Sequence, residues 1–323
     1  MNWKGWVLIL IAAMFLLSGA FSADGTGKFS IVLGGGKEHE LRDKPVWHTE
    51  RVGVEVPAYL NASTFGGSIT VNSHDRDEIL VRIHVRQRGS YLKAGEDAPV
   101  QISITDAPNG LEISAEPERS GLFGSGSSIS VSYDILVPVA TEVRAKTSGG
   151  SVSAFDIAHN VSLITSGGPV TVERVDGEVL ARTSGGPINA RNITGNLTAR
   201  TSGGGIRISN ATGNVSARTS GGPIRLDRVT GAIEAHTSGG PINAHVLYLE
   251  DHLTLTTSGG SIKAILPRDL GMDIRASGTS VRNRLDDLTG DISSRSIHGS
   301  VHGGGIPVEL RTTGGSVRIE YGD

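Results

Sequence analysis

The central part of the chain alternates apolar and polar positions in short segments that end at glycine turns. In residues 188–201, the apolar positions that recur with a period of two are Ile188, Ala190, Leu197 and Ala199, and Ile193 lies between the two segments. Asparagine, threonine and arginine fill most of the intervening positions. This period predicts β-strands with one buried and one exposed face. Residues 206–217 and 224–235 repeat the pattern, so each unit is expected to hold two short strands.

The pattern recurs with a spacing of 18 residues. The phrase Thr-Ser-Gly-Gly begins at positions 147, 165, 183, 201, 219 and 237, and it begins again at Thr257 after a two-residue insertion. One unit buries about three or four large apolar side chains, worth about 1.5 to 3 kcal/mol each. Ordering its backbone costs about 1 to 2 kcal/mol per residue. A single unit therefore cannot fold alone, whereas stacked units share hydrogen bonds and a continuous core.

The repeat consequently predicts an all-β fold. We expect a single β-solenoid, similar to a parallel β-helix, with 18-residue rungs and irregular capping strands at both ends. Within a rung the large apolar residues do not keep the six-residue spacing of a left-handed hexapeptide helix. The handedness of the solenoid therefore stays open.

The repeated phrase predicts a corner between strands. Its threonine falls on the inward register, and its two glycines are expected to supply the backbone freedom that the corner needs. Proline follows the glycine pair at positions 169, 187, 223 and 241, which marks an N–H that the strand ladder does not need. Because the threonines point inward, an outward threonine array of the ice-binding type is not expected.

The ends of the chain keep parts of this pattern. Residues 66–69 (GGSI) echo residues 149–152 (GGSV), and residues 312–317 (TTGGSV) return to the repeat. We expect the following organisation: a flexible leader over residues 21–44, an irregular N-terminal part of the solenoid over 45–146, regular repeats over 147–264, and C-terminal rungs with a cap over 265–323.

Residues 1–20 are expected to be a secretory signal peptide. An apolar run from Val7 to Leu17 is followed by the small residues at 18–20. The run is shorter than the about 20 residues that a membrane helix needs. We therefore expect cleavage after Ala20, no membrane span afterwards, and an extracytoplasmic location in the periplasm, at the cell surface or in the medium. Retention of the segment as a membrane anchor is the alternative.

Composition narrows the chemistry further. The chain has no cysteine, which excludes disulfides, thiolate metal sites and cysteine nucleophiles. Its 30 basic and 33 acidic residues are nearly balanced, so no nucleic-acid partner is expected. Aromatic residues make up only 4% beside 45 glycines, which fits a thin core of small aliphatic side chains.

The chain resembles a bacterial family of putative adhesins of unknown function whose domain consists of β-strand repeats. The resemblance rests on the repeat TSGGxIxAxxITGNxxAR, on FGGSITV at 65–71, on VSYDILVPVATEVRAKTSGGSV at 131–152 and on GGGIPVELRTTGGSVRI at 303–319. It covers most of the chain after the leader. The resemblance implies an extracytoplasmic β-solenoid with no established reaction, and it provides no catalytic residues to carry over.

No catalytic site, metal site or cofactor is expected. Enzymes that cleave polysaccharides need carboxylates that converge on a groove. The aligned positions Glu173, Arg191, Ser209 and Asp227 place no two carboxylates on neighbouring rungs. The ten histidines are scattered and do not lie beside a set of carboxylate ligands. A carbohydrate-active enzyme that uses the irregular segments 86–128 or 245–252 is the alternative.

One outward column is cationic and is the candidate binding site. It consists of Arg182, Arg200 and Arg218 on successive rungs, followed by His236. Like charges about 5 Å apart repel by roughly 1 kcal/mol in water. The column is therefore either a site for an acidic glycan or a solvated edge that discourages aggregation, with relief from Glu178 and Glu234.

Together these features predict a secreted, non-enzymatic β-solenoid scaffold, an adhesin-like interaction protein. Its partner is expected to be a cell-envelope polysaccharide or another envelope protein. A module that binds acidic glycans through the arginine column is a further alternative. The ligand, the biological process and the oligomeric state do not follow from the sequence.

Overall fold

The computed structural model describes residues 21–23, 29–31, 44–117 and 129–322. The chain divides into two units, Met1–Lys44 and Pro45–Asp323. In the first unit β1 (Phe21–Ala23) pairs antiparallel with β2 (Phe29–Ile31). The expected signal peptide, residues 1–20, and most of the expected leader lie outside the described residues. Within the part of the chain that the structure describes, no helix is long and apolar enough to cross a membrane.

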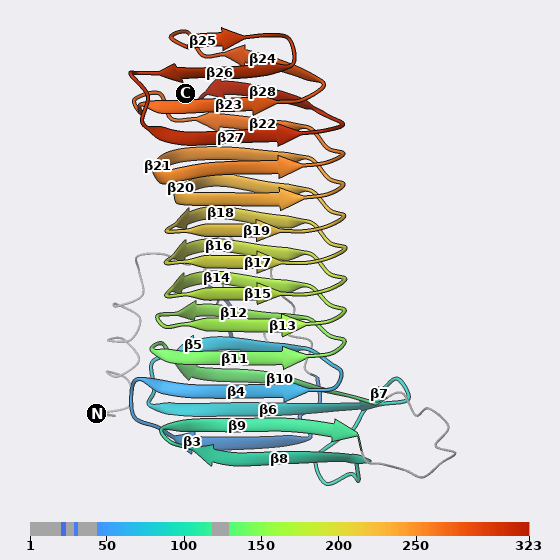
Figure 1. Ribbon diagram of the computed structural model, residues 1–323. Helices are drawn as coiled ribbons and strands as arrows, with labels where there is room; N and C mark the ends of the chain where they lie inside the picture. Colours follow the sequence, from blue (N-terminus) through green and yellow to red (C-terminus); the bar gives the residue numbers. More distant parts are fainter. Residues whose placement is uncertain (1–20, 24–28, 32–43, 118–128, 323) are drawn as a thin grey trace, which may run out of the picture. The chain divides into compact units, whose positions relative to one another are not determined.

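The unit Pro45–Asp323 is a β-solenoid with two ladders of parallel strands (Figure 1), which confirms the predicted fold class. We call the first ladder sheet A. Its regular strands are β11 (Thr141–Thr147), β13 (Val161–Thr165), β15 (Val179–Arg182), β17 (Leu197–Arg200) and β19 (Val215–Arg218). The second ladder is sheet B, with β12 (Val152–Ile157), β14 (Val170–Asp176), β16 (Ile188–Thr194) and β18 (Ile206–Thr212). The long strands β20 (Ile224–Thr237) and β21 (Ile242–Thr257) continue both ladders, because each pairs along sheet B in its first half and along sheet A in its second half.

Each rung gives one strand to each sheet and buries the predicted apolar positions between them. The register pairs residues 18 positions apart, for example Ala181 with Ala199. Leu197 and Ala199 of sheet A and Ile188 and Ala190 of sheet B are at most 2% exposed. Small aliphatic side chains from the two sheets therefore form one continuous core along the solenoid axis.

The Thr-Ser-Gly-Gly corner joins sheet A to sheet B, and its threonine connects successive rungs. Thr201, which is 6% exposed, donates from Oγ1 to the carbonyl oxygen of Gly186 at 2.9 Å. The same Oγ1 accepts the N–H of Gly204 at 3.3 Å. One inward hydroxyl thus satisfies a carbonyl of the preceding rung and closes its own corner, which confirms the inward orientation of the threonines.

The predicted reason for the glycine pair was wrong in the regular rungs. Gly203 and Gly204 do not have positive φ. Instead, a Cβ on Gly204 would lie 2.0 Å from the carbonyl oxygen of Gly186, because the backbones of stacked corners touch. Backbone freedom is needed in the opposite turn, from sheet B to sheet A, where Gly195 has a φ of 123°.

The prolines fit the corner as expected. Pro187 uses its carbonyl oxygen to accept the N–H of Val170 from the preceding rung at 3.0 Å. Pro223 accepts the N–H of Ile206 at 2.9 Å in the same way. The corner bonds to its neighbour through a carbonyl, so a residue without an N–H costs the ladder nothing at this position.

The N-terminal end adds two rungs and an antiparallel cap. Strands β4 (Ala58–Thr64) and β5 (Ile69–His74) pair with β11 and β12 and carry the predicted echo of the repeat, since Ile69 pairs with Val152. The next rung consists of β9 (Gly110–Pro117) and β10 (Ile129–Pro138). The antiparallel strands are β3 (His48–Gly53), β6 (Glu78–Gln87), the short β7 (Ser90–Tyr91) and β8 (Val100–Ala107).

At the C-terminal end, the order of the rungs departs from the order of the chain. Strands β27 (Ile306–Thr312) and β28 (Ser316–Tyr321) stack directly on β21 and β22 (Ile262–Leu266), as the recurrence of TTGGSV suggested. The earlier strands β23 (Met272–Ser277) and β24 (Ser280–Arg284) form the following rung. The antiparallel pair β25 (Thr289–Ile292) and β26 (Ser296–Val301) lies beyond them (Figure 1).

Candidate functional site

The structure brings the four predicted binding residues into one column on the outer face of sheet A. Arg182 pairs in register with Arg200, Arg200 with Arg218, and Arg218 with His236. Each arginine stands between a buried alanine and a buried threonine, so strand alternation turns it outward. The three arginines are exposed and His236 is half-buried. We call these four residues the cationic column.

The arginines of the column lack compensating partners within the described part of the chain. None of the three forms an ion pair or a side-chain hydrogen bond with another described residue. Glu178 and Glu234, expected from the sequence to compensate the arginines, form no ion pair with them. Glu234 Oε1 lies 3.4 Å from His252 Nε2, and Glu178 lines the groove described below. The column therefore presents three uncompensated charges to its surroundings.

His236 continues the column with a different electrostatic character. Its partial burial lowers the pKa of its imidazole, and the charge of Arg218 on the adjacent strand lowers it further. At neutral pH the histidine is neutral, so the charge of the column resides on the arginines. The histidine is a group that gains charge only when acid or a nearby anion favours its protonated form.

A shallow groove of about 620 Å³ lies beside the column on the same outer face. Leu180 and Thr198 line it, and each precedes an arginine of the column by two positions on the same strand. Ser162 adds a second hydroxyl, and Leu180 is 39% exposed. The groove thus offers hydroxyl groups and an apolar surface next to the arginines, and Glu142, Arg144 and Glu178 line its other parts.

The uncharged residues that line this part of the groove were not predicted as a site. Leu180, Thr198, Ser216 and Glu234 occupy one aligned register, but this register holds no two neighbouring carboxylates and so did not indicate a site. The alternation that placed the arginines on the outer face also places this register beside them. Its members pair in register in the structure, from Leu180 to Thr198 and from Thr198 to Ser216.

Sheet B carries a different charge pattern on its outer face. Glu173, Arg191, Ser209 and Asp227 align in one column, as expected, with no two carboxylates adjacent. At the bend of each strand a second column has positive φ and consists of Asp156, Arg174, Asn192, Asn210 and Arg228. Its members bond to one another, since Arg174 Nη2 donates to Asp156 Oδ2 at 2.9 Å and Arg228 Nε donates to Asn210 Oδ1 at 2.8 Å. Charged groups of both signs are therefore mixed on this face, and some of them bond to one another.

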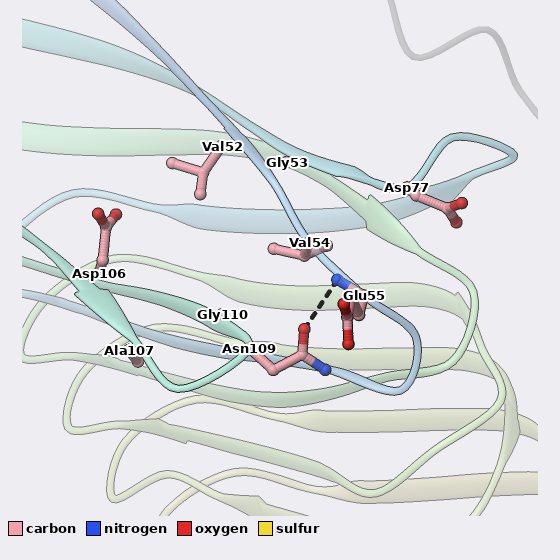
Figure 2. A pocket seen from close by; sticks show the side chains of 9 residues that line it. All are labelled: Val52, Gly53, Val54, Glu55, Asp77, Asp106, Ala107, Asn109 and Gly110. Atoms are coloured by element: carbon pink, nitrogen blue, oxygen red, sulfur yellow. Dashed lines mark hydrogen bonds between the residues drawn. The ribbon is translucent and has the colours of Figure 1, made fainter.

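An acidic depression of about 530 Å³ lies near the N-terminal cap (Figure 2). Glu55, Asp77 and Asp106 are the carboxylates among its lining residues, and Asn109 Oδ1 accepts the N–H of Glu55 at 2.7 Å. Figure 2 shows the three carboxylates spread around the depression without a common point of convergence. The depression has no arrangement of paired acids at one reaction centre.

Several histidines lie beside carboxylates. His245 Nδ1 lies 3.4 Å from Asp227 Oδ1, and His302 Nε2 lies 3.0 Å from Asp287 Oδ2. Among residues 44–117 and 129–322, no group of three or more histidines and carboxylates could hold a metal ion. The closely spaced histidines at 245 and 252 contact different carboxylates: His245 contacts Asp227, and His252 contacts both Glu234 and Asp251.

The fold and its outer faces define the class: a β-solenoid with repeated rungs and an uncompensated cationic column. The chain belongs to the Toastrack DUF4097 family, whose model matches residues 61–320. This confirms the resemblance to a family of unknown function with β-strand repeats. The comparison with curated proteins found no match.

One solved structure is similar over a large part of the chain. It is a putative cell adhesion protein from Clostridium sporogenes ATCC 15579, and the alignment covers 85% of this chain and 99% of that one. The two are 10% identical, with a TM-score of 0.21. A likeness at this level supports no argument about function.

Proposed function

We propose that the protein is a secreted, non-enzymatic scaffold that binds a partner of the cell envelope in the manner of an adhesin. The observation that supports this is the repetition of chemistry along the solenoid. Equivalent positions carry equivalent side chains over several rungs, as in the cationic column, whereas a catalytic centre needs different groups that converge at one place.

The geometry of the carboxylates favours the same proposal. On sheet B, Glu173 and Asp227 are separated by two rungs that carry Arg191 and Ser209 at the aligned positions. The carboxylates of the acidic depression point in different directions (Figure 2). Among the described residues, these two groups of carboxylates therefore do not converge at one reaction centre, whereas the outer faces offer long surfaces for contact.

Incubation of the purified protein with a panel of envelope polysaccharides tests the proposal. We expect at least one polymer to be retained by the immobilised protein while its length, measured by size-exclusion chromatography, stays constant. Shortening of any polymer would contradict the non-enzymatic role and favour the carbohydrate-active alternative. Fractionation of the producing cells tests the location, and recovery of the protein in the cytoplasm would contradict the secreted role.

A further inference from the structure

We propose that the outer face of sheet A binds a linear polysaccharide that carries carboxylate groups. In this proposal Arg182, Arg200 and Arg218 contact successive acidic groups of a chain that runs along the solenoid axis. The inference rests on the proposed function as a scaffold, and it names the class of ligand and the surface that binds it.

The outer face of sheet A is positively charged along strands β13 to β19. The outward positions of strands β13, β15, β17 and β19 hold three arginines and no carboxylate. Neighbouring arginines on stacked strands stand about 5 Å apart and repel by roughly 1 kcal/mol per pair in water. A bound chain of carboxylates replaces this repulsion with charge-assisted hydrogen bonds, because each guanidinium presents a fork of donors that matches a carboxylate.

The arginines form a straight row beside a groove. The ladder places one arginine on each rung, so the three charges form a row with the rung spacing of about 4.8 Å. Leu180 and Thr198 lie beside the row in a groove of about 620 Å³. An extended polymer with an acidic group on each sugar can follow such a row, with its ring faces against Leu180 and its hydroxyls near Thr198 and Ser162.

The same features argue against a nucleic acid. The phosphates of a duplex strand rise by about 3.4 Å each along the helix axis and wind around that axis, so they do not follow a straight row of charges with the rung spacing. Single-stranded nucleic acids are held by aromatic side chains on which the bases stack. Strands β13, β15, β17 and β19 contain no aromatic residue. Hydroxyl groups and one aliphatic side chain next to the arginines suit a sugar better than a base.

Binding to immobilised polygalacturonate, measured by surface plasmon resonance, tests the proposal. We expect the wild-type protein to bind this polymer with an affinity that falls as salt is added, and to bind dextran, which has no acidic groups, far more weakly. The triple variant Arg182→Ser, Arg200→Ser, Arg218→Ser should lose about thirtyfold in affinity, which corresponds to about 2 kcal/mol.

Sheet B supplies a matched control. Arg191, Arg207 and Arg225 are exposed on three successive rungs, and among the described residues they form no ion pair. The triple variant Arg191→Ser, Arg207→Ser, Arg225→Ser removes the same charge from the same protein. We expect it to keep its affinity for polygalacturonate within about threefold. Equal losses in the two triple variants would show a response to net charge only and would overturn the site.

Two further measurements test whether the variants are folded and whether the ligand is a polysaccharide. Circular dichroism tests whether each triple variant is folded. If the sheet A variant is not folded, the single substitution Arg200→Ser takes its place, with an expected loss of about threefold in affinity for polygalacturonate. Tighter binding of duplex DNA than of polygalacturonate would overturn the choice of ligand.

The outcome separates this inference from the proposed function. Absence of polygalacturonate binding, together with retention of another envelope polymer at constant length, would refute the site while leaving the scaffold role intact. Shortening of polygalacturonate would instead refute the scaffold role, whichever sheet binds the polymer.

Discussion

The outer faces of sheets A and B are built by the same rungs, yet they handle charge differently. On sheet B the bend column is bonded internally, as in the contact of Arg174 Nη2 with Asp156 Oδ2 at 2.9 Å. On sheet A the arginines of the cationic column repeat from rung to rung without a described partner. Repetition in a solenoid multiplies whatever one rung carries, so a column is either compensated along its length or left charged along its length. Sheet B also carries Arg207 and Arg225, which are adjacent in register and form no ion pair with a described residue, so the faces differ in that sheet A repeats one charge over three rungs in a single register.

The largest effect is expected at the corner that joins the two faces. Gly204→Ala places a Cβ 2.0 Å from the carbonyl oxygen of Gly186, and backbone atoms cannot move aside without separating the rungs. We expect a loss of about 3 kcal/mol in unfolding free energy, the upper range for overpacked sites, measured by denaturant titration. Gly203→Ala is the control, because its Cβ would lie 3.4 Å from the nearest atom. Similar losses for both substitutions would contradict this account of the corner.

The second largest effect is expected on binding when the charge of an outward arginine is reversed. Arg200→Glu removes the middle cation of the column and introduces a repelling carboxylate, so we expect about tenfold weaker binding to polygalacturonate, or about 1.4 kcal/mol. Arg207→Glu makes the same change on sheet B, where Arg207 pairs in register with Asn189 and Arg225. We expect less than a threefold change there. The comparison fails if the sheet B substitution weakens binding as much as the sheet A substitution.

The column can also be extended. Ile164 pairs in register with Lys146 on one side and Arg182 on the other, so Ile164→Arg produces five consecutive cations. We expect about threefold tighter binding to polygalacturonate, the scale of one exposed ion pair. Thr171→Arg adds the same charge to sheet B and should change binding little. Tighter binding in both variants would indicate that total charge, and not the column, determines affinity.

The sequence predicts which residues align on each sheet, but it does not predict the backbone conformation at the bends or the approach of stacked corners. The 18-residue period and the alternation determine which residues align, so the column of Arg182, Arg200 and Arg218 follows from the sequence alone. The period also aligns Asp156 with Arg174, which are 18 residues apart, but it does not signal the positive φ of the bend, which is 55° at Arg174. The role of the second glycine was also inaccessible, because the approach of Gly204 to Gly186 is a property of stacked backbones.

A smaller effect is expected from pH. Burial and the charge of Arg218 lower the pKa of His236, so the residue is neutral in the free protein at neutral pH. A bound polyanion raises that pKa, so binding takes up a proton below the ordinary histidine value of about 6.5, and affinity rises as pH falls. The charged or titratable neighbours are Arg218 in register on β19, and Glu234 on the same strand, which pairs with His252.

The measurement compares binding at about pH 7.5 and about pH 5.5, where uronic carboxylates stay ionised because their pKa is near 4. We expect about twofold tighter binding at the lower pH for the wild type and no such gain for His236→Gln. An equal gain in the variant would assign the effect to a group other than His236.

A comparably small effect separates the two faces by stability alone. Arg174→Gln removes the charge that pairs with Asp156, and we expect a loss of about 0.5 kcal/mol, typical of an exposed ion pair. Arg200→Gln removes a charge that only repels its neighbours, so the unfolding free energy should stay constant or rise slightly. Denaturant titration at low salt measures both, and added salt should shrink the difference by screening. A loss at Arg200 equal to that at Arg174 would mean that the column is already compensated, and the case for an external polyanion would fall with it.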